Sequence, residues 1–308
     1  MVYAWFVLVC LIWGSSFILM KKAAVVFGPL TIGAGRVLGG AIVLGVMIGI
    51  AAQLRREAST ESPQGDGRSW RERFSLPRFG VLMVVVVLGF LYPFSMQPYL
   101  IGRLDQSGFI GMMVCLVPLL TIGASAVLLR TWPGWRQWVG VSVGLVSMPA
   151  LFGVGLELGV SGWEFALAAT VPMGYAISNI WVKKKLSHWS PAVLTASACG
   201  LASLILVPVG VTREPMRFED AATLDVAWAI GAVLILGIMG TGVATVLFYR
   251  MVQQRGPLFA GMVTYVVPVQ ALLFGALDGE AVTPWQVVAL VVILGSVALA
   301  QWPSRAAN

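Results

Sequence analysis

The chain has 308 residues, of which 58% are hydrophobic and only 11% are charged, and its formal net charge is +7. A soluble domain carries roughly 25% charged residues, so this composition excludes an ordinary soluble globular protein. The basic residues lie in short runs between long apolar stretches, which is typical of loops between membrane helices and excludes a nucleic-acid-binding groove.

Ten apolar stretches predict ten transmembrane helices, because a helix of about 20 apolar residues crosses the hydrocarbon core of a bilayer. The predicted fold class is therefore an all-α polytopic membrane protein. The longest connection, residues 53–78, contains Pro63, Gly65 and Gly67 among mixed charges, so a loop is expected there. The ten predicted spans cover residues 2–20, 29–52, 79–101, 107–129, 138–156, 162–182, 191–211, 227–249, 258–277 and 284–302.

The distribution of basic residues predicts the orientation of these spans. An even number of spans places both termini on the same side, and with the termini inside, fourteen of the 20 Lys and Arg residues fall in inside segments. Five fall outside, and Arg36 remains within the second span. This positive-inside bias predicts that both termini are cytoplasmic. The five outside residues are Lys21, Lys22, Arg103, Arg213 and Arg217.

An internal repeat divides the chain. Residues 109–118 (FIGMMVCLVP) reappear as residues 259–268 (FAGMVTYVVP), with five identities at an offset of 150, and Trp135 and Trp285 match at the same offset. Apolar helices also resemble one another by composition, but the matched aromatic residues favour a true repeat. The predicted halves are residues 1–156, which include the 53–78 loop, and residues 157–308. Each half would hold five spans, so the second would be inverted relative to the first, as in many secondary transporters.

Several motifs resemble one known family. Residues 13–17 (WGSSF), Arg36, the helices ending at Pro118 and Pro268, and residues 279–286 (GEAVTPWQ) are similar to EamA-type members of the drug/metabolite transporter (DMT) superfamily. This resemblance covers essentially the whole chain. It implies a ten-helix inner-membrane carrier that exports amino acids or other small metabolites. Residues 261–268 (GMVTYVVP) further resemble the YddG-type exporters of aromatic amino acids.

Two departures from the family pattern distinguish the halves. The acidic residue that the family carries before the final helix is present as Glu280, but the equivalent position of the first half is Arg130. The second half also lacks a counterpart to Arg36. The resemblance therefore implies a substrate site whose two-fold symmetry is broken.

Polar side chains inside the spans are candidates for the substrate cavity, because a polar group in hydrocarbon needs a partner or a cavity. Hydroxyls and amides suit a zwitterion or a neutral polar solute, and Trp13, Trp181 and Tyr265 could enclose an apolar group. The alternative for the serines is a hydrogen bond to their own helix or a contact between helices, and Arg36 either snorkels to the outer interface or faces a substrate carboxylate. The candidates are Trp13, Ser15, Ser16, Arg36, Gln97, Tyr99, Tyr175, Asn179, Trp181, Tyr265 and Gln270.

Pro118 and Pro268 each remove a backbone hydrogen bond within an apolar helix. Their matched placement in the two halves predicts a pair of gating hinges, with static kinks as the alternative.

The sequence contains no P-loop, no nucleophile–base pair and no metal-ligand cluster, so neither an enzyme nor a requirement for a metal, a cofactor or an ATPase subunit is expected. The expected partners are a small-molecule substrate and the lipid bilayer, without nucleic acid. The leading expectation is an inner-membrane exporter of aromatic or hydrophobic amino acids that works by alternating access between the halves. A multidrug or other metabolite carrier of the same fold is the alternative, and a channel or an intramembrane enzyme is more remote.

Overall fold

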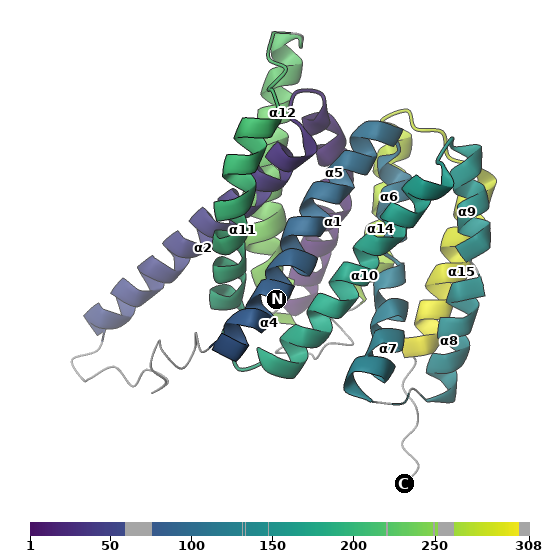
Figure 1. Cartoon of the computed structure of the whole chain (residues 1–308), viewed down its shortest axis with the longest axis horizontal. Helices are drawn as coiled ribbons and strands as arrows, with labels where there is room; N and C mark the ends of the chain where they lie inside the picture. The colour runs from purple at the N-terminus through teal and green to yellow at the C-terminus, as the bar shows by residue number, and fades with distance from the viewer. Residues whose placement is uncertain are drawn as a thin grey trace.

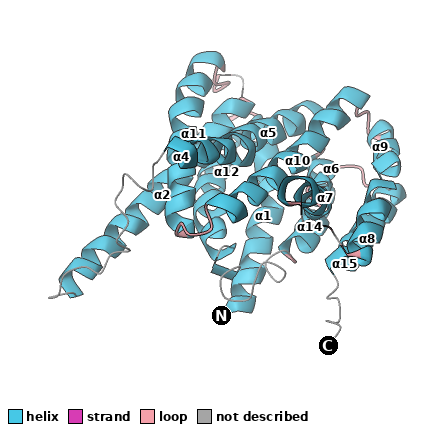
Figure 2. Cartoon of the chain, turned by 60° about the horizontal axis from the view of Figure 1, so that its bottom comes forward, coloured by secondary structure: helices cyan, strands magenta, loops and turns pink. Residues whose placement is uncertain are grey.

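The computed structural model describes residues 1–58, 76–130, 132, 134–146, 148–219, 221–248, 250–251 and 262–301. Helices make up the secondary structure of these residues, and no strand occurs among them (Figure 2). Most of the predicted 53–78 loop lies outside the described residues, as do residues 259–261 at the start of the second copy of the repeated motif. The helices are α1 (Val2–Ala24), α2 (Pro29–Ala58), α4 (Leu76–Val86), the π-helix η1 (Val87–Leu91), α5 (Tyr92–Leu104), α6 (Ser107–Met113), α7 (Leu116–Leu129), α8 (Trp135–Val146), α9 (Met148–Glu157), α10 (Gly162–Lys185), α11 (Pro191–Arg213), α12 (Thr223–Ile235), the π-helix η2 (Leu236–Val243), α14 (Val263–Leu277) and α15 (Pro284–Gln301).

Seven helical stretches are long and apolar enough to cross a membrane, and the chain is a polytopic helical membrane protein. Two shorter apolar helices, Val263–Leu277 and Pro284–Leu299, coincide with the last two predicted spans. The fifth predicted span is occupied by α8 and α9. Ten spans in two inverted halves therefore stay a prediction. The seven stretches are Val2–Ala24, Pro29–Leu54, Phe79–Leu104, Ser107–Leu128, Gly162–Lys185, Pro191–Arg213 and Thr223–Phe248.

Helix starts follow local sequence signals. At α10, the hydroxyl of Ser161 accepts a hydrogen bond from Glu164 N, and the Glu164 carboxylate accepts one from Ser161 N, which is a capping box. At α15, Thr283 and Gln286 form the equivalent pair, with 2.7 Å between Thr283 N and Gln286 Oε1. Proline follows the cap at the start of α15, where its missing N–H costs nothing.

Five short connections meet at one end of the helix bundle, at the top of Figure 1. We call this the loop end, and it comprises residues 25–28, 105–106, 158–161, 214–222 and 278–283. Arg217 N donates to Val26 O at 3.0 Å, and Arg103 pairs with Glu164. The opposite end holds Arg130, the C-cap residue of α7, and the connection at residues 186–190, and there Lys184 Nζ donates to Leu128 O at 3.1 Å.

The start of α2 is held by the carboxylate of Glu214, the residue that follows α11, and its middle by a close glycine contact with η2. Glu214 accepts hydrogen bonds from Leu30 N and Thr31 N, at 3.0 and 2.8 Å. Further along, α2 crosses η2 so closely that a Cβ at Gly39 would lie 2.9 Å from Gly237 Cα. Small residues let the two backbones approach in this way, and the crossing fixes the rotation of α2.

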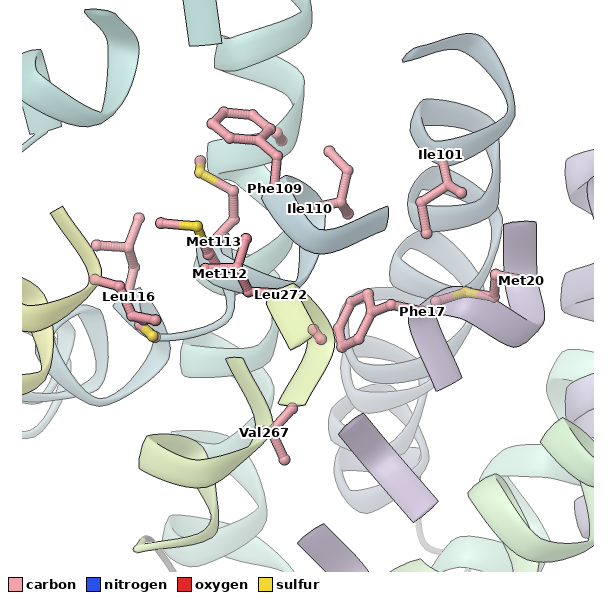
Figure 3. Close-up of a cluster of buried hydrophobic side chains, with 14 of the residues drawn as sticks. Phe17, Met20, Ile101, Phe109, Ile110, Met112, Met113, Leu116, Val267 and Leu272 are labelled. Carbon is pink, nitrogen blue, oxygen red and sulfur yellow. The ribbon is translucent and has the colours of Figure 1, made fainter. Parts of the chain in front are cut away.

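The main hydrophobic core lies where α1, α5, α6 and α14 meet. Figure 3 shows Phe17 of α1 pointing toward α14, and Met20 of α1 close to Ile101 of α5. Phe109, on the short helix α6, is fully buried in this cluster. The core therefore joins helices from both predicted halves of the chain.

Candidate functional site

A cavity of about 210 Å³ lies among helices from both halves of the chain. It is lined by residues of α1, α2, α4, η1, α5, the α6–α7 junction, α7, α10, η2, the helical residues that follow η2, and α14. Its aromatic lining residues are Trp13, Phe17, Phe90, Phe94, Tyr175 and Phe248, and its polar ones are Ser16, Arg36, Gln97, Ser178, Asn179, Thr245 and Thr264.

The structure brings six of the eleven predicted site residues to this cavity and places five elsewhere. The six are Trp13, Ser16, Arg36, Gln97, Tyr175 and Asn179. Ser15 hydrogen-bonds to Ile12 O, and Tyr99, 40% exposed, lines a separate pocket at the loop end. The ring of Trp181 lies under the ammonium group of Lys184, and Tyr265 packs against the main core. Gln270 fills the contact between α14 and Gly14 of α1.

Helix geometry explains part of this division, as for Ser15, whereas Gln270 follows the lining residue Val267 by three residues and is set apart by its contact with Gly14. Each residue turns the helix by about 100°, so neighbours such as Ser15 and Ser16 face different surroundings. The polarity of the two side chains therefore does not show which of them lines the cavity. Residues three, four and seven apart do share a face, and Phe90, Phe94 and Gln97 follow that spacing. This periodicity, applied from Gln97, would have found Phe90 and Phe94, which the search for polar residues missed.

Arg36 is the charged residue of the cavity and is only 5% exposed. Its guanidinium carbon lies 3.9 Å from the centroid of the Phe94 ring, and Nη1 donates to Met20 Sδ at 3.2 Å. Sulfur is a weak acceptor, and Nε has no hydrogen-bond partner. Within the described part of the chain, no carboxylate pairs with Arg36. Of the two predicted placements, the structure adopts the one that faces the cavity.

This arrangement makes the cavity suited to binding an anionic group. A buried cation is costly unless a partner of opposite charge neutralises it. The planar guanidinium is suited to a carboxylate, which can accept two parallel hydrogen bonds.

Aromatic rings form the apolar walls. Trp13 Nε1 donates to Gly240 O in η2 at 3.0 Å, and the Trp13 ring centroid lies 5.1 Å from that of Phe248. The Phe90 and Phe94 centroids are 5.6 Å apart. Because the indole N–H of Trp13 is already bonded, its ring contributes an apolar surface to the cavity. Both π-helices contribute lining residues, as is frequent for π-bulges at functional sites.

The serine and proline predictions have distinct structural settings. The Ser16 hydroxyl donates to Ile12 O at 2.8 Å, which is the bond to its own helix that was the predicted alternative. Pro118 lies in the first turn of α7, directly after the break between α6 and α7, and Pro268 lies inside α14. Val114, Val117 and Val267, beside these prolines, line the cavity. Movement at either proline would therefore change the cavity wall.

Comparison with known proteins gives a family and several relatives. The profile described as the EamA-like transporter family matches residues 1–152 and 162–302. An S-adenosylmethionine/S-adenosylhomocysteine transporter of Chlamydia trachomatis serovar L2 is 27% identical over 293 residues, which cover 89% of this chain and 80% of that protein. A transporter of the same name from Chlamydia muridarum is 26% identical over 296 residues, covering 89% and 83%. A solved structure with 19% identity matches over 99% of this chain and 98% of its own, with a TM-score of 0.61, which supports the fold alone.

Proposed function

Because the chain belongs to the EamA-like transporter family, we propose that it moves a small zwitterionic metabolite across the membrane and binds its carboxylate at Arg36. The family identifies a multi-pass membrane transporter with a small-molecule substrate, which is not an enzyme. The observation that carries the substrate class is the buried guanidinium of Arg36, which faces the cavity without a carboxylate partner among the described residues.

The proposed substrate is an aromatic or hydrophobic amino acid. Its carboxylate would pair with Arg36, and its side chain would lie against Trp13 and Phe248. A volume of about 210 Å³ is below the roughly 300–1,000 Å³ of pockets for drug-sized ligands, so an amino acid fits it better than a larger solute. No Asp or Glu belongs to the described lining, which counts against a carrier of cationic drugs.

S-adenosylmethionine and S-adenosylhomocysteine form the second candidate substrate class. The relatives from Chlamydia that carry this name match 89% of the chain. Both molecules contain the amino-acid carboxylate that Arg36 would bind and a flat adenine that the aromatic walls could contact. Their size requires the cavity to widen, so the two classes differ in the space that the substrate needs.

The proposed mechanism is alternating access between two inverted halves, residues 1–156 and 157–308. Two facts support it: the family profile matches two successive segments, and the cavity is lined from both of them. Pro118 and Pro268 are the proposed hinges beside the cavity.

The proposed orientation has both termini in the cytoplasm of a cell with a bacterial-type inner membrane, and the direction is export. The excess of basic residues on one side of the predicted spans supports it. Reporter fusions at the two termini test the orientation: alkaline phosphatase should be inactive and green fluorescent protein fluorescent at both ends.

Counterflow into proteoliposomes tests the substrate. Vesicles loaded with unlabelled solute should accumulate labelled L-phenylalanine or L-tryptophan, and competition with S-adenosylmethionine separates the two classes. Arg36→Gln should lower counterflow by about tenfold or more, since one lost charged hydrogen bond is worth roughly 1.5–3 kcal/mol. Arg36→Lys keeps the positive charge but lacks the planar set of N–H donors. Its counterflow rate should therefore lie between those of the unmodified protein and Arg36→Gln.

Arg213→Gln is the matched control, because Arg213 is an exposed arginine at the loop end. It should transport at the rate of the unmodified protein. Equal transport and equal substrate binding by Arg36→Gln would overturn the role proposed for Arg36.

A further inference from the structure

Lys21 joins three carboxylates at the loop end. Its Nζ lies 3.0 Å from Asp105 Oδ1, 3.1 Å from Asp278 Oδ2 and 3.1 Å from Glu280 Oε1. The neighbouring Lys22 pairs with Asp278 Oδ1 at 2.5 Å. The Lys21 side chain is 14% exposed and that of Glu280 3%, so the centre of this cluster is shielded from solvent.

Glu280 also holds the first turn of α6. Its Oε1 accepts hydrogen bonds from Ser107 N and Ser107 Oγ at 2.9 and 2.6 Å, and its Oε2 accepts one from Gly108 N at 2.9 Å. Two glycines make room for the carboxylate. A Cβ at Gly275 would overlap Glu280 Oε2, and one at Gly108 would lie 3.2 Å from the same atom. The backbone thus forms a fitted socket for this side chain.

These contacts connect the two segments that the family profile matches. Lys21, Lys22, Asp105 and Ser107 belong to residues 1–152, whereas Asp278 and Glu280 belong to residues 162–302. A rocking motion that separates the segments at the loop end has to break them. The cluster is therefore placed to control that motion.

The cluster lies directly beyond the cavity wall. Phe17 and Met20 of α1 line the cavity. Lys21 lies on the same helix, four residues after Phe17 and one residue after Met20. At 1.5 Å per residue, Lys21 is about 6 Å further along α1 than Phe17. Phe17, Met20 and Ile101 belong to the apolar core beside the cavity (Figure 3).

We propose that Lys21, Asp105, Asp278 and Glu280 form an ion-pair latch that holds the loop end of the cavity closed and opens once in each transport cycle. The latch rests on the alternating access proposed above and adds gating residues to it. None of these four residues lines the cavity, so they act as positioning residues.

Accessibility of a cavity cysteine tests the latch without a known substrate. In a protein whose buried Cys10, Cys115 and Cys199 are replaced by alanine, Ser16→Cys places a thiol in the cavity. A membrane-impermeant maleimide is applied to sided vesicles. A second reporter, Ala222→Cys in the exposed connection before α12, shows that the reagent reaches the loop end.

The labelling rate should rise with the number of ion pairs removed. Lys21→Gln, which removes three, should speed labelling of Ser16→Cys by about tenfold, and Asp278→Asn, which removes two, by less. Lys22→Gln removes one and should stay within about twofold. Lys183→Gln at the opposite end is the matched control and should change nothing.

An unchanged labelling rate in Lys21→Gln, while Ala222→Cys reacts normally, would overturn the latch. Gel filtration identifies any variant that does not fold. Asp278→Asn then replaces Lys21→Gln, because it removes two ion pairs and leaves the Lys21–Glu280 pair in place, and an increase in labelling is again expected. Labelling does not depend on substrate, so it can support the latch even when Arg36→Gln transports normally and the substrate proposal fails.

Discussion

The loop end and the opposite end of the bundle both carry basic side chains, but their surroundings differ. At the loop end, Lys21 contacts three carboxylates. At the opposite end, Lys183, Lys184, Lys185 and Arg130 are exposed, and Lys184 donates to the carbonyl oxygen of Leu128. None of these four pairs with a carboxylate among the described residues. Basic residues thus have two different settings: they join helices at the loop end, and they are exposed at the opposite end, where they are predicted to bias membrane orientation.

A methyl group added to the socket that holds Glu280 should have the largest effect on stability of the changes that distinguish the two ends of the bundle. Gly275→Ala places a Cβ where Glu280 Oε2 lies, so the carboxylate must leave Lys21 and the α6 backbone. We expect a loss of about 3 kcal/mol in the free energy of unfolding, the usual cost of breaking a buried ion pair. Thermal unfolding in detergent measures it. Gly295→Ala is the control, since its Cβ meets nothing within 4 Å, and a loss there as large would contradict the socket.

The same substitution at two lysines compares the ends directly. Lys21→Gln should lower the free energy of unfolding by about 2 kcal/mol, because charged hydrogen bonds contribute roughly 1.5–3 kcal/mol each and the amide retains part of the contact. Lys183→Gln, on an exposed side chain, should stay within about 0.5 kcal/mol. Equal effects in chemical denaturation would remove the distinction between the two ends.

Acid should weaken the loop end within a defined pH range. Burial alone would raise the pKa of Asp278, but hydrogen bonds from Lys22 and Lys21 outweigh it and hold the pKa below its ordinary value. A carboxyl whose folded pKa is below the unfolded value of about 4 stabilises the fold above that pH, and the contribution is lost as the pH falls through the folded pKa.

Unfolding of the unmodified protein and of Asp278→Asn, compared from pH 7 to pH 3, measures this contribution. The gap between their unfolding temperatures should be constant down to about pH 4 and close below it. A gap that closes near pH 6 would mean that another group controls the loop end.

Glycine substitutions at two helix C-caps should have the smallest effect on stability. Asp105, after α5, and Arg130, after α7, have φ angles of 55° and 53°, a conformation that glycine adopts with less strain. Arg130→Gly should stabilise the protein by about 1 kcal/mol. Asp105→Gly should gain less, because it also loses the contact with Lys21. An equal gain at both positions, measured by thermal unfolding, would show that the Asp105 contact contributes nothing.

Sequence patterns predicted where helices lie better than which faces they share. The apolar stretches coincide with helices, because hydropathy is a property of each segment, but α2 continues to Ala58 within the predicted 53–78 loop, and the fifth stretch holds both α8 and α9. The π-helices η1 and η2 were not predicted, since their extra residue per turn follows from packing against other helices. The ten-span inverted arrangement stays a prediction.

The cavity was predictable only in part for the same reason. Polarity in an apolar segment pointed to Arg36 and Gln97, and both line the cavity. It also pointed to Ser15, which lies on another face of α1, and to Gln270, which follows Val267 by three residues but fills the contact between α14 and Gly14 of α1. The pairing of Lys21 with Glu280 joins residues 259 positions apart, so their spacing carries no signal. Lys21 was counted only as a marker of orientation.

The proposed latch has a thermodynamic consequence because it lies at one end alone. Contacts within the protein are restored at the end of every cycle, so they can neither drive net flux nor choose its direction. They set the ratio of the two conformations at rest. That ratio changes tenfold for about every 1.4 kcal/mol of change in the free-energy difference between the conformations. Weakening Lys21 should therefore alter the apparent affinity on each side of the membrane, while the solute concentrations at which net flux ceases stay the same.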